Sequence, residues 1–340
     1  MNSYKKAITL FCAILLAALP LTSCKNNEKL LESSADEKKT VLTVGEYDVP
    51  MEMYRYVALN YKNDYENGNT SDIWLGESGQ ELLTELGQAS RDTIANLYTT
   101  LCICADYGIN PDDGYITDAV DAKMDEIYEG YDYDYESYLT DIGASYMNDS
   151  VYRFLVRNDI MADELIEAMK KKGELPSTDE EFEEILSGPE FIRVKQILVP
   201  RDSGSTDEEN LAYAESLLEK ARAGEDFDEL VQKYGKDLYL FNNKDGYYVS
   251  RGNYYEEFEN AAFSLEMDEI SGIVETGAGY SIIKRYPKEP EYMAKKFDEL
   301  KENYIRGQYN IILGKRLADI EVKETDEMKN FSVFNMTMDK

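Results

Sequence analysis

The sequence contains no histidine in its 340 residues. Without histidine there is no Ser-His-Asp or Cys-His nucleophile, no histidine-ligated zinc and no histidine-based pH switch. Positive charge is also scarce, because 36 lysine and arginine residues stand against 68 acidic ones, for a formal net charge of −32. This deficit argues against a nucleic-acid partner, whose phosphates need lysine and arginine contacts. Nothing in the composition points to a metal or another cofactor, and we expect none.

The N-terminal segment is a targeting signal rather than part of the fold. Two lysines precede an apolar run over 7–19, which is too short for a membrane-spanning helix. The sequence Leu21-Thr22-Ser23-Cys24 follows and resembles the bacterial lipobox. That resemblance implies a signal peptide over 1–23, cleavage before Cys24 and lipidation of its thiol. The protein would then be anchored by acyl chains on the extracytoplasmic face of the cell membrane; an ordinary secretory signal with an incidental cysteine is the alternative.

The remaining cysteines do not build a disulfide framework. Cys12 lies within the predicted signal peptide, and Cys24 lies at the lipobox. Cys102 and Cys104 are two residues apart in a helical pattern, so they point to different sides of one helix and a bridge between them is not expected. Both are interpreted as small buried apolar residues.

The chain up to residue 189 has mostly helical periodicity. Residues 24–40 are polar and aperiodic, which predicts a flexible tether. A short strand and turn are expected at 41–45, and Pro50 then opens a helix. The Asn-, Gly- and Asp-rich stretch 63–80 is predicted to be a loop. Apolar residues at helical spacing predict further helices over about 88–107, from 110 to 127 and over 148–171.

A tyrosine-rich stretch runs from Tyr131 to Tyr138, with acidic residues between the tyrosines. Alternating carboxylates are compatible with calcium, but the EF-hand pattern requires a glycine where Ser137 stands. We therefore expect a solvated surface rich in tyrosine, which would also suit contact with unfolded polypeptide.

The periodicity changes after Ser187-Gly188-Pro189, which is the clearest domain boundary in the chain. Residues 192–199 alternate as a strand does, and Thr206 with Glu209 forms a capping box that opens a helix. A strand is expected again at 280–285. This order of elements predicts a compact α+β domain of ordinary size.

The segment 191–286 resembles the parvulin family of peptidyl-prolyl isomerases. Each of the stretches that carry the likeness is weak alone, but they occur in the family's order and spacing. They are Val194-Lys195-Gln196-Ile197-Leu198-Val199; Ala223 to Leu230 with Tyr234-Gly235-Lys236-Asp237; Arg251-Gly252 with Glu257 to Leu265; and Glu269 to Thr276 with Gly279 to Ile283.

The layout of the whole chain is similar to that of the PrsA-type foldases, relatives of the SurA chaperones. The resemblance implies an α+β fold, in which a mostly helical, split chaperone domain carries an inserted parvulin domain. That inserted domain is expected to have a small antiparallel sheet flanked by helices. The implied boundaries are 24–40 for the tether, 41–189 for the N-terminal helical part, 190–287 for the parvulin-like domain, 288–323 for the C-terminal helix that completes the chaperone domain, and 324–340 for a polar tail.

The resemblance also carries over site residues, with two departures. Gln196 and Ser281 stand at the family's two histidine positions, whereas Asp237 matches its Cys/Asp position. These three are the candidate catalytic residues. The candidate substrate-binding residues are Phe258, Tyr254 and Thr276. The other interpretation is that Phe258 is an ordinary core aromatic and Asp237 a turn or helix-terminus residue.

Two functions follow from this likeness. The first is a membrane-anchored extracytoplasmic foldase that assists newly secreted or unfolded polypeptides as a parvulin-type isomerase of reduced activity. The second is a non-catalytic holdase or scaffold, since both family histidines are replaced. A solute-binding lipoprotein is disfavoured, because 50–171 shows only helical periods where that class needs alternating strands and helices. The assembly state, with a homodimer as one outcome, stays open.

Overall fold

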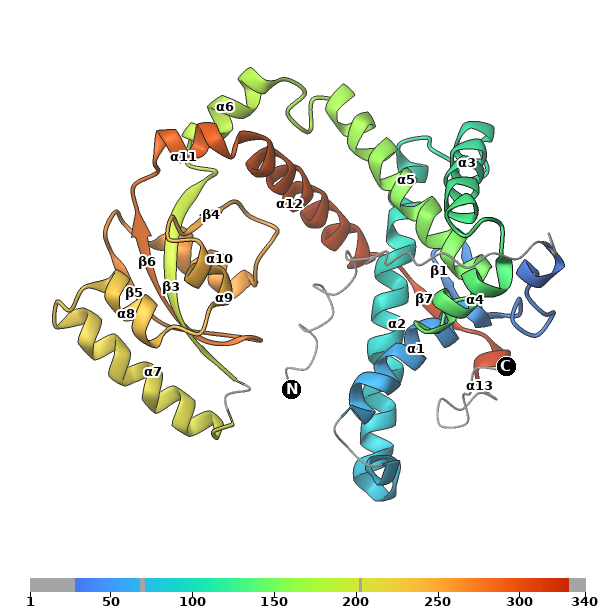
Figure 1. Cartoon of the computed structure of the whole chain (residues 1–340), viewed down its shortest axis with the longest axis horizontal. Helices are drawn as coiled ribbons and strands as arrows, with labels where there is room; N and C mark the ends of the chain where they lie inside the picture. Colours follow the sequence, from blue (N-terminus) through green and yellow to red (C-terminus); the bar gives the residue numbers. More distant parts are fainter. Residues whose placement is uncertain (1–27, 68–70, 202–203, 330–340) are drawn as a thin grey trace. The chain divides into compact units, whose positions relative to one another are not determined.

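The computed structural model describes residues 28–67, 71–201 and 204–329. Cys24 and the predicted signal peptide lie outside these residues. The chain divides into two compact units. The boundaries between them fall at 168/169, within helix α5 (Asp149–Lys171), and at 312/313, within helix α12 (Phe297–Leu317). Figure 1 labels both helices. We call residues 169–312 the sheet unit, and the described residues before 169 and after 312 the helical unit. Among the described residues, no helix has both the length and the hydropathy to cross a membrane.

The sheet unit is built on a four-stranded antiparallel sheet in the order β4-β3-β6-β5. Its strands are β3 (Ile192–Pro200), β4 (Tyr247–Val249), β5 (Ile270–Thr276) and β6 (Gly279–Tyr286). The helices are α6 (Asp179–Ser187), α7 (Asp207–Arg222), α8 (Phe227–Tyr234), α9 (Leu238–Asn242), α10 (Glu256–Ser264), α11 (Pro290–Lys295) and the first part of α12. The fold class expected for this segment, a small antiparallel sheet flanked by helices, is confirmed.

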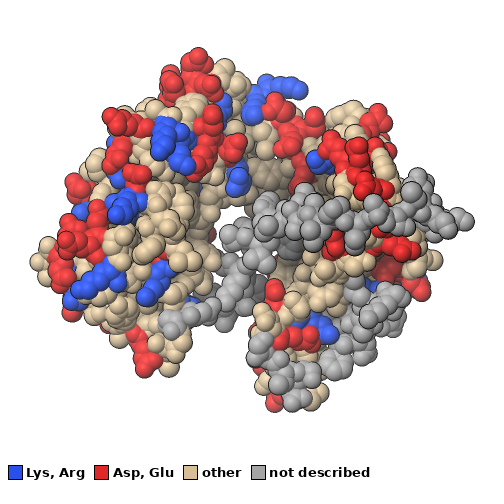
Figure 2. All heavy atoms as spheres, in the orientation of Figure 1, with Lys and Arg blue, Asp and Glu red and all other residues tan. Residues whose placement is uncertain are grey.

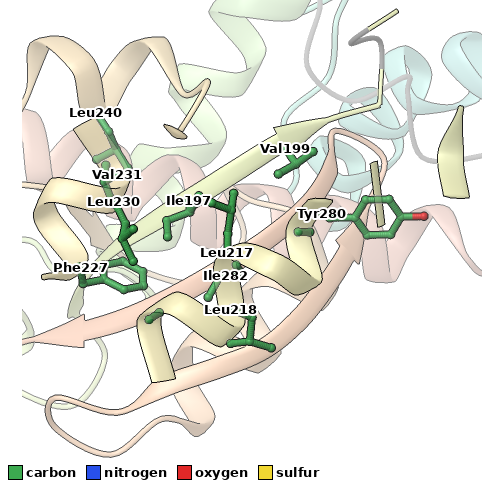
Figure 3. Close-up of a cluster of buried hydrophobic side chains, with 12 residues drawn as sticks. Ile197, Val199, Leu217, Leu218, Phe227, Leu230, Val231, Leu240, Tyr280 and Ile282 are labelled. Carbon is green, nitrogen blue, oxygen red and sulfur yellow. The ribbon is translucent and has the colours of Figure 1, made fainter. Parts of the chain in front are cut away.

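One face of this sheet packs against α7 and α8. Ile197 and Val199 of β3 and Ile282 of β6 are buried there, together with apolar side chains of both helices (Figure 3). The predicted capping box at the start of α7 is present, with Thr206 and Glu209 bonding each other's backbone N–H. This face is the hydrophobic core that holds β3 and β6 rigid.

The opposite face packs against α10 and carries the polar positions of interest. Val194 and Ile283 are buried here with Phe258 of α10. Because side chains alternate along a strand, Gln196 shares the face of Val194, and Ser281 shares the face of Ile283. The register pairs Leu198 with Ser281 and Gln196 with Ile283, so the two polar residues are diagonal neighbours on adjacent strands.

A third cluster joins α6 and α12 to the sheet unit. Phe182, Phe191 and Leu300 are buried together, with Tyr304 packed against them. The helix that begins at residue 179 and residues 297–312 of α12 lie in the same compact unit as the sheet. The reason is this aromatic cluster, which the periodicity of single helices does not reveal. The domain boundaries at 190 and 287 stay a prediction.

The helical unit combines long helices with a small antiparallel sheet in the order β2-β1-β7. Its strands are β1 (Thr40–Val44), β2 (Tyr47–Pro50) and β7 (Val322–Glu324). The helices are α1 (Met51–Glu66), α2 (Gly76–Asp106), α3 (Gly114–Gly130), α4 (Tyr135–Gly143), most of α5, the end of α12 and α13 (Asp326–Lys329), with short 3-10 turns η1 (Glu28–Leu31) and η2 (Ser71–Trp74). The C-terminal segment thus returns to the N-terminal part by strand pairing.

Two expectations for this unit are corrected. The loop predicted over 63–80 is shorter, because α1 continues to Glu66 and α2 already begins at Gly76. Gly76 and Gly79 belong to the first residues of α2. Part of the predicted tether is folded, since Ser33 bonds Ser150 (2.9 Å between the hydroxyl oxygens) and Glu37 pairs with Arg55. Polar composition concealed these partners.

The tyrosine-rich stretch is not a solvated surface. Tyr135 and Tyr138 are buried, and Tyr138 packs edge-on against Tyr128 of α3. The hydroxyls of Tyr128 and Tyr138 both donate to Asp149 Oδ1, at 2.5 and 3.1 Å, and Arg153 lies 3.3 Å from the same carboxylate. Asp132 and Glu136 are exposed, whereas the rings of Tyr135 and Tyr138 belong to the core. No group of residues suited to a metal ion occurs in the described part of the chain.

Cys102 and Cys104 are free and buried, as expected. Burial raises the pKa of the Cys104 thiol to about 12 and also raises that of Cys102. Both thiols are therefore protonated at neutral pH and chemically inert.

Candidate functional site

Three residues chosen from the sequence meet in one hydrogen-bonded chain. Ser281 Oγ donates to Gln196 Oε1 at 2.7 Å, and Gln196 Nε2 donates to Asp237 Oδ2 at 2.6 Å. Gln196 is half-buried on β3, Ser281 is buried on β6, and Asp237 reaches them from the turn before α9. The side-chain amide of Gln196 thus links β3 and β6 to the carboxylate: its oxygen accepts one hydrogen bond and its nitrogen donates one.

Tyr247 of β4 is a fourth member that the sequence did not reveal. Its hydroxyl lies 2.9 and 2.8 Å from the two carboxylate oxygens of Asp237 and donates to them. Burial, followed by the charge of Asp237, raises the pKa of Tyr247 well above its ordinary value. The phenol therefore stays a hydrogen-bond donor at all physiological pH values. Tyr247 pairs with Val194 across β3 and β4. This pairing would have pointed to Tyr247, but the sequence does not predict the short strand β4.

Asp237 also begins α9. Its Oδ1 accepts from the backbone N–H of Tyr239 at 3.0 Å and of Leu240 at 3.4 Å. Asp237 is thus a helix-cap residue and also a member of the polar chain, and its catalytic role stays a prediction. Among the residues that the structure describes, every hydrogen bond to this half-buried carboxylate comes from a neutral donor, and no cation lies within hydrogen-bond range of it.

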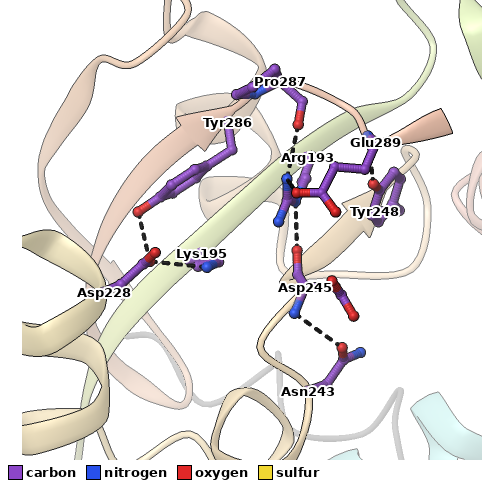
Figure 4. Close-up of polar contacts among 9 residues, drawn as sticks. All are labelled: Arg193, Lys195, Asp228, Asn243, Asp245, Tyr248, Tyr286, Pro287 and Glu289. Atoms are coloured by element: carbon purple, nitrogen blue, oxygen red, sulfur yellow. Dashed lines mark hydrogen bonds and ion pairs between the residues drawn. The ribbon is translucent and has the colours of Figure 1, made fainter. Parts of the chain in front are cut away.

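The loop between α9 and β4 is fastened to β3, and this places Tyr247. Arg193 Nε donates to the carbonyl of Asp245 at 2.5 Å, and its guanidinium also pairs with Glu289 (Figure 4). Gly246 has a φ of +89°, and a Cβ there would lie 2.7 Å from the carbonyl oxygen of Val194. Only glycine allows this close approach. The turn that leads into Tyr247 therefore requires glycine at position 246.

A row of aromatic rings continues from the polar chain to the apolar face. Tyr239 stacks on Tyr247 with ring centroids 4.5 Å apart, and Tyr254 lies 5.7 Å beyond Tyr247. Tyr254 in turn is 5.6 Å from Phe258, which is buried in the α10 cluster. Tyr254 is 38% exposed, although burial around its hydroxyl raises its pKa to about 12. The row offers an apolar surface beside the charged Asp237.

The loop that presents Tyr254 is held by a buried carboxylate of α10. Glu259 Oε1 accepts from the backbone N–H groups of Gly252, Asn253 and Tyr254 at 2.8 to 3.0 Å. Burial raises the pKa of Glu259, and these three bonds oppose the rise. Glu259 thus fixes the position of the Tyr254 ring by bonding the backbone of Tyr254.

Thr276 does not join this group. Its hydroxyl accepts from the N–H of Ala278 at 3.2 Å and donates to the carbonyl of Gly279 at 3.3 Å, which closes the turn between β5 and β6. Phe258 is both a core residue and the inner end of the aromatic row. The structure therefore unites five of the six carried-over residues and gives Thr276 a role in a turn.

Comparison with known proteins finds relatives of the segment that carries this site. Residues 191–286 match the family described as "Rotamase: PPIC-type PPIASE domain". This segment is a rotamase domain. The boundaries of the match coincide with the start of β3 and the end of β6, so the four-stranded sheet and the helices between its strands form the domain.

Relatives over more of the chain are PrsA foldases, which confirms the likeness to that type. The chain is 30% identical over 179 residues to "Foldase protein PrsA" of Bacillus subtilis, and the match covers 50% of this chain and 58% of that protein. It is 26% identical over 312 residues to the protein of that name from Caldanaerobacter subterraneus, covering 88% and 89%. The crystal structure of peptidylprolyl isomerase (PrsA) from Bacillus anthracis is similar at a TM-score of 0.38 and 20% identity, covering 73% and 98%.

Proposed function

We propose that the rotamase domain catalyses cis–trans isomerisation of Xaa-Pro bonds in unfolded polypeptides without histidine. The observation that carries the proposal is the charged Asp237, held by Gln196 and Tyr247 beside the row of aromatic rings. A proline ring would lie against Phe258 and Tyr254, with its preceding peptide bond near the carboxylate. Gln196 and Tyr247 lie on strands β3 and β4 and both bond Asp237, while Phe258 lies on α10 and Glu259 of the same helix holds the loop of Tyr254.

The chemistry needs no bond to break. Rotation about the peptide bond faces a barrier of about 18–20 kcal/mol, because resonance places negative charge on the carbonyl oxygen and double-bond character on C–N. A fixed carboxylate near that oxygen disfavours the charge-separated form and so favours the twisted amide. Only an interaction stronger in the twisted state speeds the reaction. Asp237 would supply it, while Gln196 and Tyr247 would orient the carboxylate.

The decisive experiment is exchange NMR on short Xaa-Pro peptides with the chain from Lys25 to Lys340, which contains every described residue. Uncatalysed exchange takes about 10–100 s at 25 °C, so weak catalysis is measurable. We expect acceleration that falls about tenfold or more in Asp237→Asn, since a hydrogen bond to a charged group contributes about 1.5–3 kcal/mol. Asp228→Asn, on the opposite face beside Lys195, is the matched control. No acceleration across several residues preceding proline would contradict the proposal.

We further propose that the protein is a foldase anchored at Cys24 to the extracytoplasmic face of the membrane. The lipobox-like order of residues supports this. Figure 2 shows acidic side chains spread over the drawn face with basic ones among them, a surface that keeps the protein and its clients soluble. Cys24→Ser should release the chain from the membrane fraction in the producing cell, and Cys12→Ser should not. Retention of the Cys24→Ser chain on the membrane would contradict the anchor.

A second function, holding unfolded chains without catalysis, is favoured by apolar side chains of α9. Leu238 and Phe241 are 80% and 65% exposed, and both lie on the helix that Asp237 caps. Exposed apolar groups of this kind mark interaction surfaces. The double variant Leu238→Ser/Phe241→Ser should lose suppression of client aggregation, whereas Met267→Ser, at a 52% exposed position of the same unit, should not. Equal suppression by both variants would rule out α9 as the contact.

A further inference from the structure

The helical unit contains a cavity of about 450 Å³ that the rotamase chemistry does not use. Its lining has an apolar part made by Met53, Leu101 and Val151, and an aromatic part made by Tyr98 and Phe154. The two aromatic rings are stacked with centroids 4.6 Å apart. A preformed cavity with stacked rings is suited to a bulky apolar side chain.

Two arginines of α5 line this cavity, and they differ in their partners. Arg153 lies 2.6 Å from Asp121 and 3.3 Å from Asp149. Arg157, one turn later, has a buried Nε with no hydrogen-bond partner in the described part of the chain, and no ion pair is found for it there. A buried donor that is left unpaired destabilises the fold, so an acceptor arriving from outside would be favoured.

The cavity also borders a free sheet edge. β2 is the outer strand of its sheet, and Tyr47, Asp48 and Pro50 line the cavity. Val44 pairs with Tyr47 across a two-residue turn. Because inward and outward backbone groups alternate along an antiparallel strand, the N–H and C=O of Asp48 then point away from β1. An extended chain could add to this edge through those groups.

We propose that this cavity binds an extended polypeptide segment with a bulky apolar residue and, two positions later, an acidic residue. The segment pairs with the edge at Asp48, its apolar side chain enters against Tyr98, and its carboxylate bonds Arg157. Residues two apart in a strand share a face, which fixes this spacing. In a chain with almost twice as many acidic as basic residues, an unpaired arginine in a recess is the complement of an acidic group.

The proposal rests on the proposed function only in taking polypeptide as the ligand, because the site requires no proline. The neighbouring acids limit the ligand further. Asp48 and Asp112 also line the cavity, so a segment with several adjacent acidic residues would be repelled. One acidic residue per segment is therefore the favoured pattern.

The test uses the chain from Lys25 to Lys340 and a dye-labelled peptide without proline, acetyl-Gly-Phe-Ser-Glu-Gly-amide, in fluorescence anisotropy. We expect Arg157→Gln to weaken binding about tenfold, and Arg222→Gln, an exposed arginine of the sheet unit, to leave it unchanged. A peptide with Gln for Glu should bind the original chain as weakly as it binds Arg157→Gln. Equal affinity for both peptides overturns the assignment of Arg157, even if that variant does not fold.

The location is tested by methyl-labelled methionine in NMR, with Met53 assigned through Met53→Leu. Addition of the peptide should shift the Met53 signal and leave that of Met124, buried elsewhere in the helical unit, in place. A shift of Met267 or Met293 without Met53 places binding in the sheet unit and overturns the proposal. A Met53 shift on concentrating the protein alone assigns the cavity to a second copy instead. Loss of prolyl exchange with intact peptide binding refutes the proposed function and leaves this site standing.

Discussion

Each unit of the molecule holds an aspartate that accepts hydrogen bonds from tyrosine, two hydroxyls at Asp149 and one at Asp237, but the two arrangements differ in access and charge. Asp149 in the helical unit is 5% exposed and faces Tyr128, Tyr138 and the cation of Arg153. Asp237 in the rotamase domain is half-buried and meets only neutral donors. The closed, cation-paired group is a structural joint between helices. The open group leaves its carboxylate partly accessible to solvent.

The largest effect that would sharpen this comparison is on stability. Asp149→Ala leaves two buried hydroxyls and Arg153 without their shared partner, and we expect a loss of about 3–5 kcal/mol in the free energy of unfolding. Asp237→Ala removes a helix cap and should cost about 1 kcal/mol. Urea unfolding followed by circular dichroism measures both. Similar losses for the two variants would show that Asp237 is as structural as Asp149.

Removal of one tyrosine hydroxyl beside each aspartate should give smaller effects that also distinguish Asp149 from Asp237. Tyr138→Phe should lower the free energy of unfolding by about 1–2 kcal/mol with no effect on prolyl exchange, because a buried carboxylate loses one donor. Tyr247→Phe should slow exchange about threefold to tenfold with a stability change below about 1 kcal/mol. Exchange NMR and urea unfolding on both variants provide the readouts. If Tyr247→Phe exchanges at the original rate, Tyr247 does not orient the carboxylate.

Stability and prolyl exchange should not depend on pH in the range where histidine titrates in most proteins. With no histidine, both stability and exchange should be constant from pH 6 to 9. Burial raises the pKa values of Tyr54 and Tyr56 to about 12, above the unfolded value near 10. Folding thus favours the protonated phenols, and their contribution is complete below pH 10 and lost as the pH rises toward 12. Thermal unfolding across this range tests it; a stability change near pH 6.5 would contradict it.

The smallest effect concerns Thr276, the one carried-over residue that lies outside the site. Thr276→Ser keeps the hydroxyl that closes the β5–β6 turn, so exchange should stay within about twofold of the original rate. Thr276→Val removes both turn bonds and should cost about 1 kcal/mol of stability. A large loss of exchange in Thr276→Ser, measured under the same conditions, would bring this residue back into the site.

The sequence predicted the rotamase domain well, because its signals are local. Strand alternation predicted the strand over 192–199, the capping box at Thr206 marked a helix start, and the likeness to a family pointed to Gln196 and Ser281. The likeness to a family then supplied Asp237. Tyr247 was missed because its strand is three residues long and has no periodicity to detect. In the helical unit, the early start of α2 and the burial of Tyr138 depend on contacts between distant segments, to which local patterns are blind.

The pairing of β7 with β1 has a consequence for the order of synthesis. Residues 169–312 form a continuous stretch, so a growing chain holds the whole sheet unit before β7 is made. The sheet of the helical unit must wait for Val322 to pair with Val44, and Thr325 then donates to the carbonyl of Thr40 at 2.8 Å. Until then β1 and β2 are a two-stranded hairpin, which is marginal alone. A chain that ends before β7, or loses it by cleavage, therefore leaves β1 without its second partner strand. The unpaired edge of β1 is then accessible to proteases.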